Sequence, residues 1–135
     1  MNEKYDEAAQ RHWRDAEWLS GEQRTENADQ LYGLAAECAV KAVLSKLPGC
    51  LSDGELAPAY RKHIDKLWSS ILVQGVTKLA PGLQAVVQAG NPFQDWRVEQ
   101  RYAGDGVVSS SSMASHRQAA KRPLGACGLS GSRGR

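Results

Sequence analysis

No apolar stretch of this chain is long enough to cross a membrane, and we expect no leader sequence at its N-terminus. The apolar runs fall well short of the ~20 residues that a membrane-spanning helix needs. The chain opens with Met-Asn-Glu-Lys-Tyr-Asp-Glu, which is mostly polar and is followed by no apolar segment, so a signal peptide is excluded. We therefore expect a cytoplasmic protein that makes no contact with a membrane.

Closely spaced cysteines are absent as well. The 135 residues include 3 cysteines, Cys38, Cys50 and Cys127, and no Cys-x-x-Cys pair. An odd number at such spacing excludes a disulfide framework of the secreted type and favours a reducing, intracellular setting. Cys38 lies among apolar residues at helical intervals, which is typical of a small buried side chain.

The sequence lacks complete catalytic, phosphate-binding and metal-binding motifs. It contains neither the Gly-x-Ser-x-Gly motif of serine hydrolases nor the Gly-rich Gly-Lys-[Ser/Thr] motif of P-loops. Metal sites on helices usually combine histidines and carboxylates three or four residues apart. His12 has only Asp15 at such a distance, and His63 has no partner of this kind. We expect no metal, no cofactor and no catalytic residue.

Acidic residues are missing from the last part of the chain. Residues 107–135 contain five Lys or Arg and no Asp or Glu, whereas residues 1–106 hold 12 Lys or Arg and all 15 Asp and Glu. The pI near 8.5 therefore arises from the C-terminal part, and the acidic remainder argues against strong generic DNA binding. We predict a helical domain over 1–106 and a flexible Gly/Ser/Arg-rich tail over 107–135. This basic tail should be mostly disordered, with a short helix over 113–122 that Pro123 stops.

What the chain does have is a regular helical pattern. Residues 4–20, 24–47, 58–73 and 78–89 each carry apolar side chains at intervals of three and four, which is the period of one helix face. Small residues such as Ala35, Cys38 and Ala42 lie on the apolar stripe of the second segment, so a neighbouring helix can approach it closely. Pro48-Gly49 ends that helix, and a loop follows over 48–57.

Residues 91–104 contain aromatic side chains without a helical period. We predict an extended connector there, laid across the bundle and pinned by its aromatic residues. The predicted fold class is therefore all-α: a small up-and-down bundle of four to five helices with an extended aromatic connector and a flexible basic C-terminal tail.

The segment from 93 to 102 is the strongest candidate for ligand binding. It interleaves Trp96 and Tyr102 with Arg97 and Arg101, a mixture that can stack on bases and hold phosphates. His63, in the third predicted helix, is the fifth candidate ligand-binding residue.

A structural interpretation of the same residues stays open. Trp96 and Tyr102 can instead anchor the connector to the bundle while the arginines pair with Asp95 and Glu99. His63 can likewise be a half-buried side chain that is hydrogen-bonded to a neighbour.

The chain resembles the HEPN family (higher eukaryotes and prokaryotes nucleotide-binding). The resemblance is carried by Gly33-Leu-Ala-Ala-Glu-Cys-Ala-Val-Lys-Ala42, by Lys62-His-Ile-Asp-Lys-Leu67 and by Trp96-Arg-Val-Glu-Gln-Arg-Tyr102. It covers residues 5–103 and implies an up-and-down α-bundle, often a homodimer. It also implies a toxin–antitoxin or defence setting with a nucleotidyltransferase as partner protein.

Many members of that family are metal-independent ribonucleases with an Arg followed four to six residues later by a His. Here Arg101 is followed by no histidine before His116. The resemblance therefore favours a non-catalytic module that binds a nucleotide, an RNA or a partner protein. Two alternatives stay open: a ribonuclease that pairs Arg101 with His116 or His63, and a purely structural accessory subunit of an oligomer.

Overall fold

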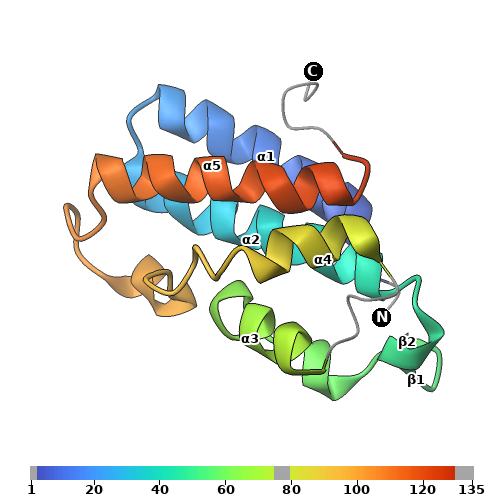
Figure 1. Cartoon of the computed structure of the whole chain (residues 1–135). Coiled ribbons are helices and arrows are strands. Elements are labelled where there is room, and N and C mark those ends of the chain that lie inside the picture. Colours follow the sequence, from blue (N-terminus) through green and yellow to red (C-terminus); the bar gives the residue numbers. More distant parts are fainter. Residues whose placement is uncertain (1–2, 75–79, 130–135) are drawn as a thin grey trace.

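The computed structural model describes residues 3–74 and 80–129, and within them the chain forms an all-α bundle (Figure 1). The structure is mostly helical with five α-helices, which confirms the predicted fold class. They are α1 (Tyr5–Gly21), α2 (Thr25–Leu44), α3 (Ile64–Gln74), α4 (Pro81–Gln88) and α5 (Ser110–Ala126).

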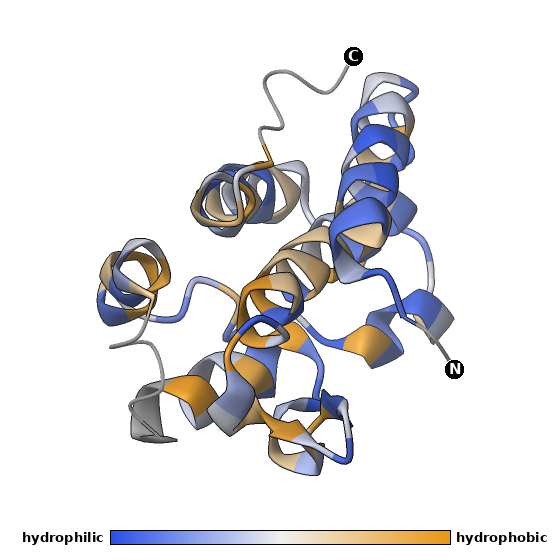
Figure 2. Ribbon diagram, turned by 90° about the vertical axis from the view of Figure 1, so that its right-hand side faces the viewer, coloured by the Kyte–Doolittle hydropathy of each residue, from blue (hydrophilic) through white to orange (hydrophobic). Residues whose placement is uncertain are grey.

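Helix α2 is the central element of the bundle. Most of its 20 residues are buried, and it packs against α1, α5 and α3. Its small side chains, among them Ala28, Ala35, Ala36 and Ala39, are fully buried and allow these neighbours to approach closely. In the hydropathy colouring of Figure 2, the helix in the middle of the view is mostly tan to orange, whereas the long helix at the upper right is mostly blue.

The loop predicted over 48–57 contains a small hairpin between two 3₁₀ turns. The turn η1 (Pro48–Cys50) leads into β1 (Leu51–Ser52), which pairs antiparallel with β2 (Glu55–Leu56). Asp53 and Gly54 close the hairpin with positive φ angles of 54° and 78°. Such a turn favours Asp and Gly at these positions.

The third and fourth helices differ from their predicted bounds. Pro58 begins a 3₁₀ turn, η2 (Pro58–Tyr60), and the α-helix starts only at Ile64. Helix α4 begins at Pro81, where proline suits the first helical turn. Residues 78 and 79, which were expected to open this helix, lie outside the described residues.

The C-terminal part corrects the prediction of a mostly disordered tail. Ser110–Ala126 is a 17-residue α-helix that packs against α2, and the Ser109 hydroxyl caps its N-terminus by accepting from the Ser112 amide at 3.0 Å. Its apolar stripe was hard to recognise because it is short of large side chains and contains His116. Pro123 does not stop the helix, because α5 continues for three residues beyond it, to Ala126.

The aromatic connector is shorter and more ordered than predicted. Phe93 and Trp96 are fully buried, and residues after them form a 3₁₀ helix, η4 (Val98–Tyr102), in place of an extended segment. The Trp96 indole lies directly over Gly33 of α2, where a Cβ atom would come within 2.1 Å of the ring. Gly33 is therefore needed for this contact, since any larger residue overlaps the indole.

We expect Gly33→Ala to lower the free energy of unfolding by about 2 kcal/mol, the usual cost of overpacking a rigid contact. Urea denaturation monitored by tryptophan fluorescence would measure this. Gly125→Ala is the matched control, because a Cβ atom at that position would meet no other described part of the chain within 4 Å. That change should leave stability unaltered or raise it by up to ~1 kcal/mol through helix propensity. Equal effects of the two substitutions would contradict the contact.

Candidate functional site

The five residues predicted to bind a ligand fall into three places. Trp96 belongs to the core: it is fully buried and its Nε1 donates to the backbone oxygen of Asp29 at 3.0 Å. Its ring is therefore closed to a ligand, as the anchoring interpretation predicted. Arg97 and His63 come together at one surface, and Arg101 and Tyr102 form a separate exposed pair.

Arg97 and His63 line a groove of about 380 Å³ between the start of α3 and the start of η4. We call it the α3–η4 groove. Its other lining residues, none of which was predicted to bind a ligand, are Lys62, Asp65, Lys66, Val98 and Glu99.

A buried carboxylate orients His63. Glu37 of α2, whose side chain is 8% exposed, lies 3.0 Å from Nδ1 of His63 through its Oε1. The same oxygen accepts from the Ile64 amide at 3.1 Å, and Oε2 accepts from Lys41 Nζ at 2.9 Å. The imidazole itself is half-exposed, so its outer edge faces the groove. A histidine fixed by a buried acid can hold an anion or exchange a proton there.

Backbone oxygens and one carboxylate fix Arg97. Its Nη1 donates to the backbone oxygen of Trp96 at 2.8 Å and lies 3.4 Å from Oδ2 of Asp65. The Arg97 backbone oxygen accepts from Gln30 Nε2 at 2.8 Å. About half of the guanidinium side chain is still exposed, so it is both held in place and accessible.

The groove carries an excess of positive charge. The groove is lined by three cations, Lys62, Lys66 and Arg97, and by two carboxylates, Asp65 and Glu99. His63 adds a further positive charge when it is protonated. Lys62 Nζ donates to the Ser70 hydroxyl at 2.9 Å, which leaves its charge unneutralised.

Arg101 and Tyr102 lie at the far end of η4. The Arg101 guanidinium lies 5.0 Å from the centre of the Tyr102 ring, and Tyr102 is 77% exposed. At about 2 Å per residue of a 3₁₀ helix, this pair is roughly 8 Å along the axis from Val98 at the groove. An exposed aromatic ring backed by a cation is a surface on which a base can stack.

A second cluster of charged side chains, which we call the His116 cluster, surrounds the buried imidazole of His116 and is not indicated by the sequence. His116 of α5 lies between two carboxylates: its Nδ1 is 2.6 Å from Asp29 Oδ1 and its Nε2 is 2.7 Å from Asp95 Oδ1. Burial lowers the pKa of His116, but the hydrogen bonds and negative charges of both carboxylates outweigh it, so the pKa is raised overall. The three residues are far apart in sequence, and no short-range pattern could have indicated their meeting.

The ribonuclease pair of Arg101 with His116 is not assembled. His116 is 1% exposed, and both of its ring nitrogens are taken up by the carboxylates of Asp29 and Asp95. No substrate can reach it in this arrangement. Within residues 3–74 and 80–129, no group of three or more His, Cys, Asp or Glu is placed to hold a metal ion.

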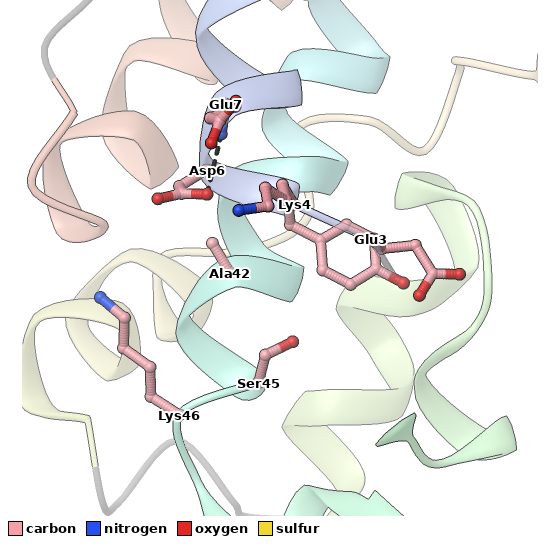
Figure 3. A pocket seen from close by; sticks show the side chains of 8 residues that line it. Glu3, Lys4, Asp6, Glu7, Ala42, Ser45 and Lys46 are labelled. Carbon is pink, nitrogen blue, oxygen red and sulfur yellow. Dashed lines mark hydrogen bonds between the residues drawn. The ribbon is translucent and has the colours of Figure 1, made fainter. Parts of the chain in front are cut away.

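A second hollow of about 370 Å³ lies where the start of α1 meets the end of α2 (Figure 3). Exposed Lys4, Asp6 and Lys46 border it. Acidic side chains in a first helical turn are explained by the helix dipole, and Asp6 also accepts from the Glu7 amide. Among the described residues, no buried polar side chain points to a ligand there, so the α3–η4 groove is the better candidate.

Comparison with known proteins adds no function. No protein-family model, curated protein or solved structure gives a significant match to the chain. In the part of the chain that the structure covers, no helix combines the length and apolarity needed to span a membrane. The site therefore has to be interpreted from its own geometry.

We expect Glu37→Gln to lower the free energy of unfolding by about 3 kcal/mol, because Lys41 would lose the counter-charge of a nearly buried pair. Chemical denaturation measures the change. Glu55→Gln is the matched control, since Glu55 pairs with Arg61 in an exposed ion pair at 3.2 Å. Such pairs contribute under about 1 kcal/mol. A loss from Glu37→Gln as small as that of the control would show that Glu37 does not fix this region.

Proposed function

We propose that this protein is a binding module that holds the phosphates of a nucleotide or a single-stranded RNA in the α3–η4 groove. The observation that carries the proposal is the convergence of Lys62, His63, Lys66 and Arg97 on one groove. A guanidinium and ammonium groups are the usual partners of phosphate oxygens. RNA is favoured over a lone anion because Tyr102 offers a stacking surface at the other end of η4.

Pre-organisation supports a binding role for Arg97 and His63. Both side chains are tied to the bundle by hydrogen bonds and remain about half-exposed. A ligand that meets such groups does not have to order them first, which lowers the entropic cost of binding. Lys66 is exposed and extends the positive surface without this constraint.

The wider setting implied by the HEPN resemblance belongs to the same proposal. It comprises a homodimer, a nucleotidyltransferase as partner and a place in a toxin–antitoxin or defence system. The bundle is consistent with such a chain, and Trp18, 65% exposed on α1, is one apolar side chain that a protein contact would cover. Light scattering of the purified chain, with and without RNA, tests the dimer.

Binding should depend on the groove cations and on salt. We expect Lys66→Ala to weaken binding of a labelled single-stranded RNA and to reduce the slope of log K against log salt by about 0.7. Tyr102→Ala should cost about 1–3 kcal/mol of binding with little change in the salt slope. Fluorescence anisotropy over a salt series measures both.

Lys46→Ala is the control for this series, because it removes an exposed lysine that borders the other hollow. Arg101→Ala should also weaken binding while the protein stays folded. If Lys66→Ala and Lys46→Ala bind RNA alike, the ligand does not occupy the α3–η4 groove.

A second candidate function, a metal-independent ribonuclease, is favoured by one observation. Glu37 holds Nδ1 of His63 at 3.0 Å, so Nε2 is directed outward, as in a histidine that a carboxylate orients for proton transfer. Arg97 in the same groove would stabilise negative charge on phosphorus. If this function holds, the protein cleaves RNA in the presence of a chelator and His63→Ala lowers the rate by about 100-fold or more. Absence of cleavage by a concentrated wild-type sample would leave binding alone.

A further inference from the structure

The His116 cluster joins helix α5 to the segment that carries Arg97. Asp29 comes from α2, His116 from α5, and Asp95 from the residues that lead into η4. The Phe93 ring stacks on the imidazole with ring centres 5.5 Å apart. Three separate parts of the chain therefore meet at one histidine ring.

The hydrogen bonding at this ring requires a proton on each of its two nitrogens. A neutral imidazole has one donor nitrogen and one acceptor nitrogen, whereas an ionised carboxylate only accepts. Both nitrogens of His116 contact carboxylate oxygens, at 2.6 and 2.7 Å, so both contacts are satisfied together when the ring is an imidazolium. Asp29 Oδ2 is buried and, among the described residues, has no hydrogen-bond partner, so the imidazolium is the main compensation for its charge.

The same segment positions Arg97. Trp96 donates to the Asp29 backbone oxygen, and the Arg97 backbone oxygen accepts from Gln30. Residues 96 and 97 are thus held on α2 by Asp29 and Gln30, and the first of these also contacts His116. Asp95, which contacts the His116 ring, is two residues before Arg97, whose guanidinium lines the α3–η4 groove.

Other charges near His116 are engaged elsewhere. On α5, Arg117 makes two hydrogen bonds to Glu17 of α1, at 2.6 and 3.0 Å, and Glu17 also accepts from Tyr32. The α4 sequence, Pro81–Gln88, contains no titratable residue. Asp29 and Asp95 are therefore the charges that face the ring within the described part of the bundle.

We propose that a proton on His116 holds the segment 93–97, and with it Arg97, against α2. This inference concerns the regulation of the groove and rests on the proposed function for its effect on RNA binding. Because the charged form is the one that the folded state stabilises, the hold is complete at low pH and is lost as the pH rises through the pKa of His116.

The test uses Asp95→Asn in the full chain. Asp95 is 67% exposed, so its replacement should leave the protein folded while removing one of the two charges that stabilise the imidazolium. We expect the NMR titration midpoint of His116 to fall by about 1 pH unit. Asp105→Asn is the matched control, because it makes the same chemical change at an exposed turn that does not touch His116.

Two further measurements follow the segment itself. After correction for the rise of base-catalysed intrinsic exchange with pH, hydrogen exchange of the Trp96 indole N–H should accelerate above the His116 midpoint, and at lower pH in Asp95→Asn than in the wild type. Affinity for a labelled single-stranded RNA should fall at the same pH. The RNA titration compares Asp95→Asn with the wild type and with Asp105→Asn. The groove residues are the same in all three proteins, so they do not contribute to the difference in midpoint.

The outcomes separate this inference from the function on which it rests. A His116 ring that stays neutral throughout, with the proton on a carboxylate, would overturn the inference, as would a titration that leaves Trp96 exchange unchanged. If Trp96 exchange follows His116 while RNA binds at no pH, the proton-dependent hold stands and the proposed function fails. Coincident changes in ring charge, indole exchange and RNA affinity would support both.

Discussion

The fold and the candidate site both depend on a buried carboxylate, that of Asp29 in the central helix. The side chain is 1% exposed, and its Oδ1 meets the imidazole of His116 while its backbone oxygen accepts from Trp96. One residue of α2 thus holds both the C-terminal helix and the aromatic connector. A carboxylate in such surroundings requires a compensating positive charge, and His116 is the group that supplies it.

Asp29 belongs to a row of residues on α2 spaced four apart. Asp29, Gly33, Glu37 and Lys41 follow one another at intervals of one helical turn, so they lie along one ridge of the helix. Asp29 and Glu37 are about 12 Å apart along the axis, and each holds a histidine from another element. Between them Gly33 leaves room for the Trp96 indole. The connector therefore crosses α2 at Gly33, and the two carboxylates on either side of this position along the helix each hold a different element of the bundle.

Periodicity was sufficient to predict the first two helices but insufficient to predict the last helix or how the helices meet. The apolar intervals in 4–20 and 24–47 correspond closely to α1 and α2, because both helices bury an apolar stripe. Residues 110–126 were harder, since the buried face of α5 includes His116 and small alanines, which resemble the composition of a flexible tail. A polar residue that is buried because a distant acid pairs with it leaves no trace in local hydropathy.

The candidate site shows the same limit. Arg97 and His63 were selected for their chemistry, and the α3–η4 groove brings these two together. Trp96 was selected for the same reason, yet its ring is fully buried. The sequence alone does not show that Trp96 is a core residue, because an aromatic residue that anchors a segment and one that binds a base have similar neighbours in the sequence. Lys62 and Lys66 belong to the segment Lys62–Leu67 that carries part of the HEPN resemblance, but their place in the groove depends on where α3 begins.

Buried charge along this ridge affects specificity more than stability. Desolvation of Asp29 and Glu37 costs free energy that their partners return only in good geometry, so the net gain from each pair is small. Any other placement of α5 or of residues 93–97, however, would leave a buried carboxylate unpaired, and that is strongly unfavourable. The bundle thus has one well-defined arrangement of connector and C-terminal helix. His63 is held by Glu37 of this ridge, and Arg97 is held on α2 by Gln30 and follows Trp96, which contacts Asp29. The distance between the two groups in the groove is therefore set inside the bundle and not by the ligand.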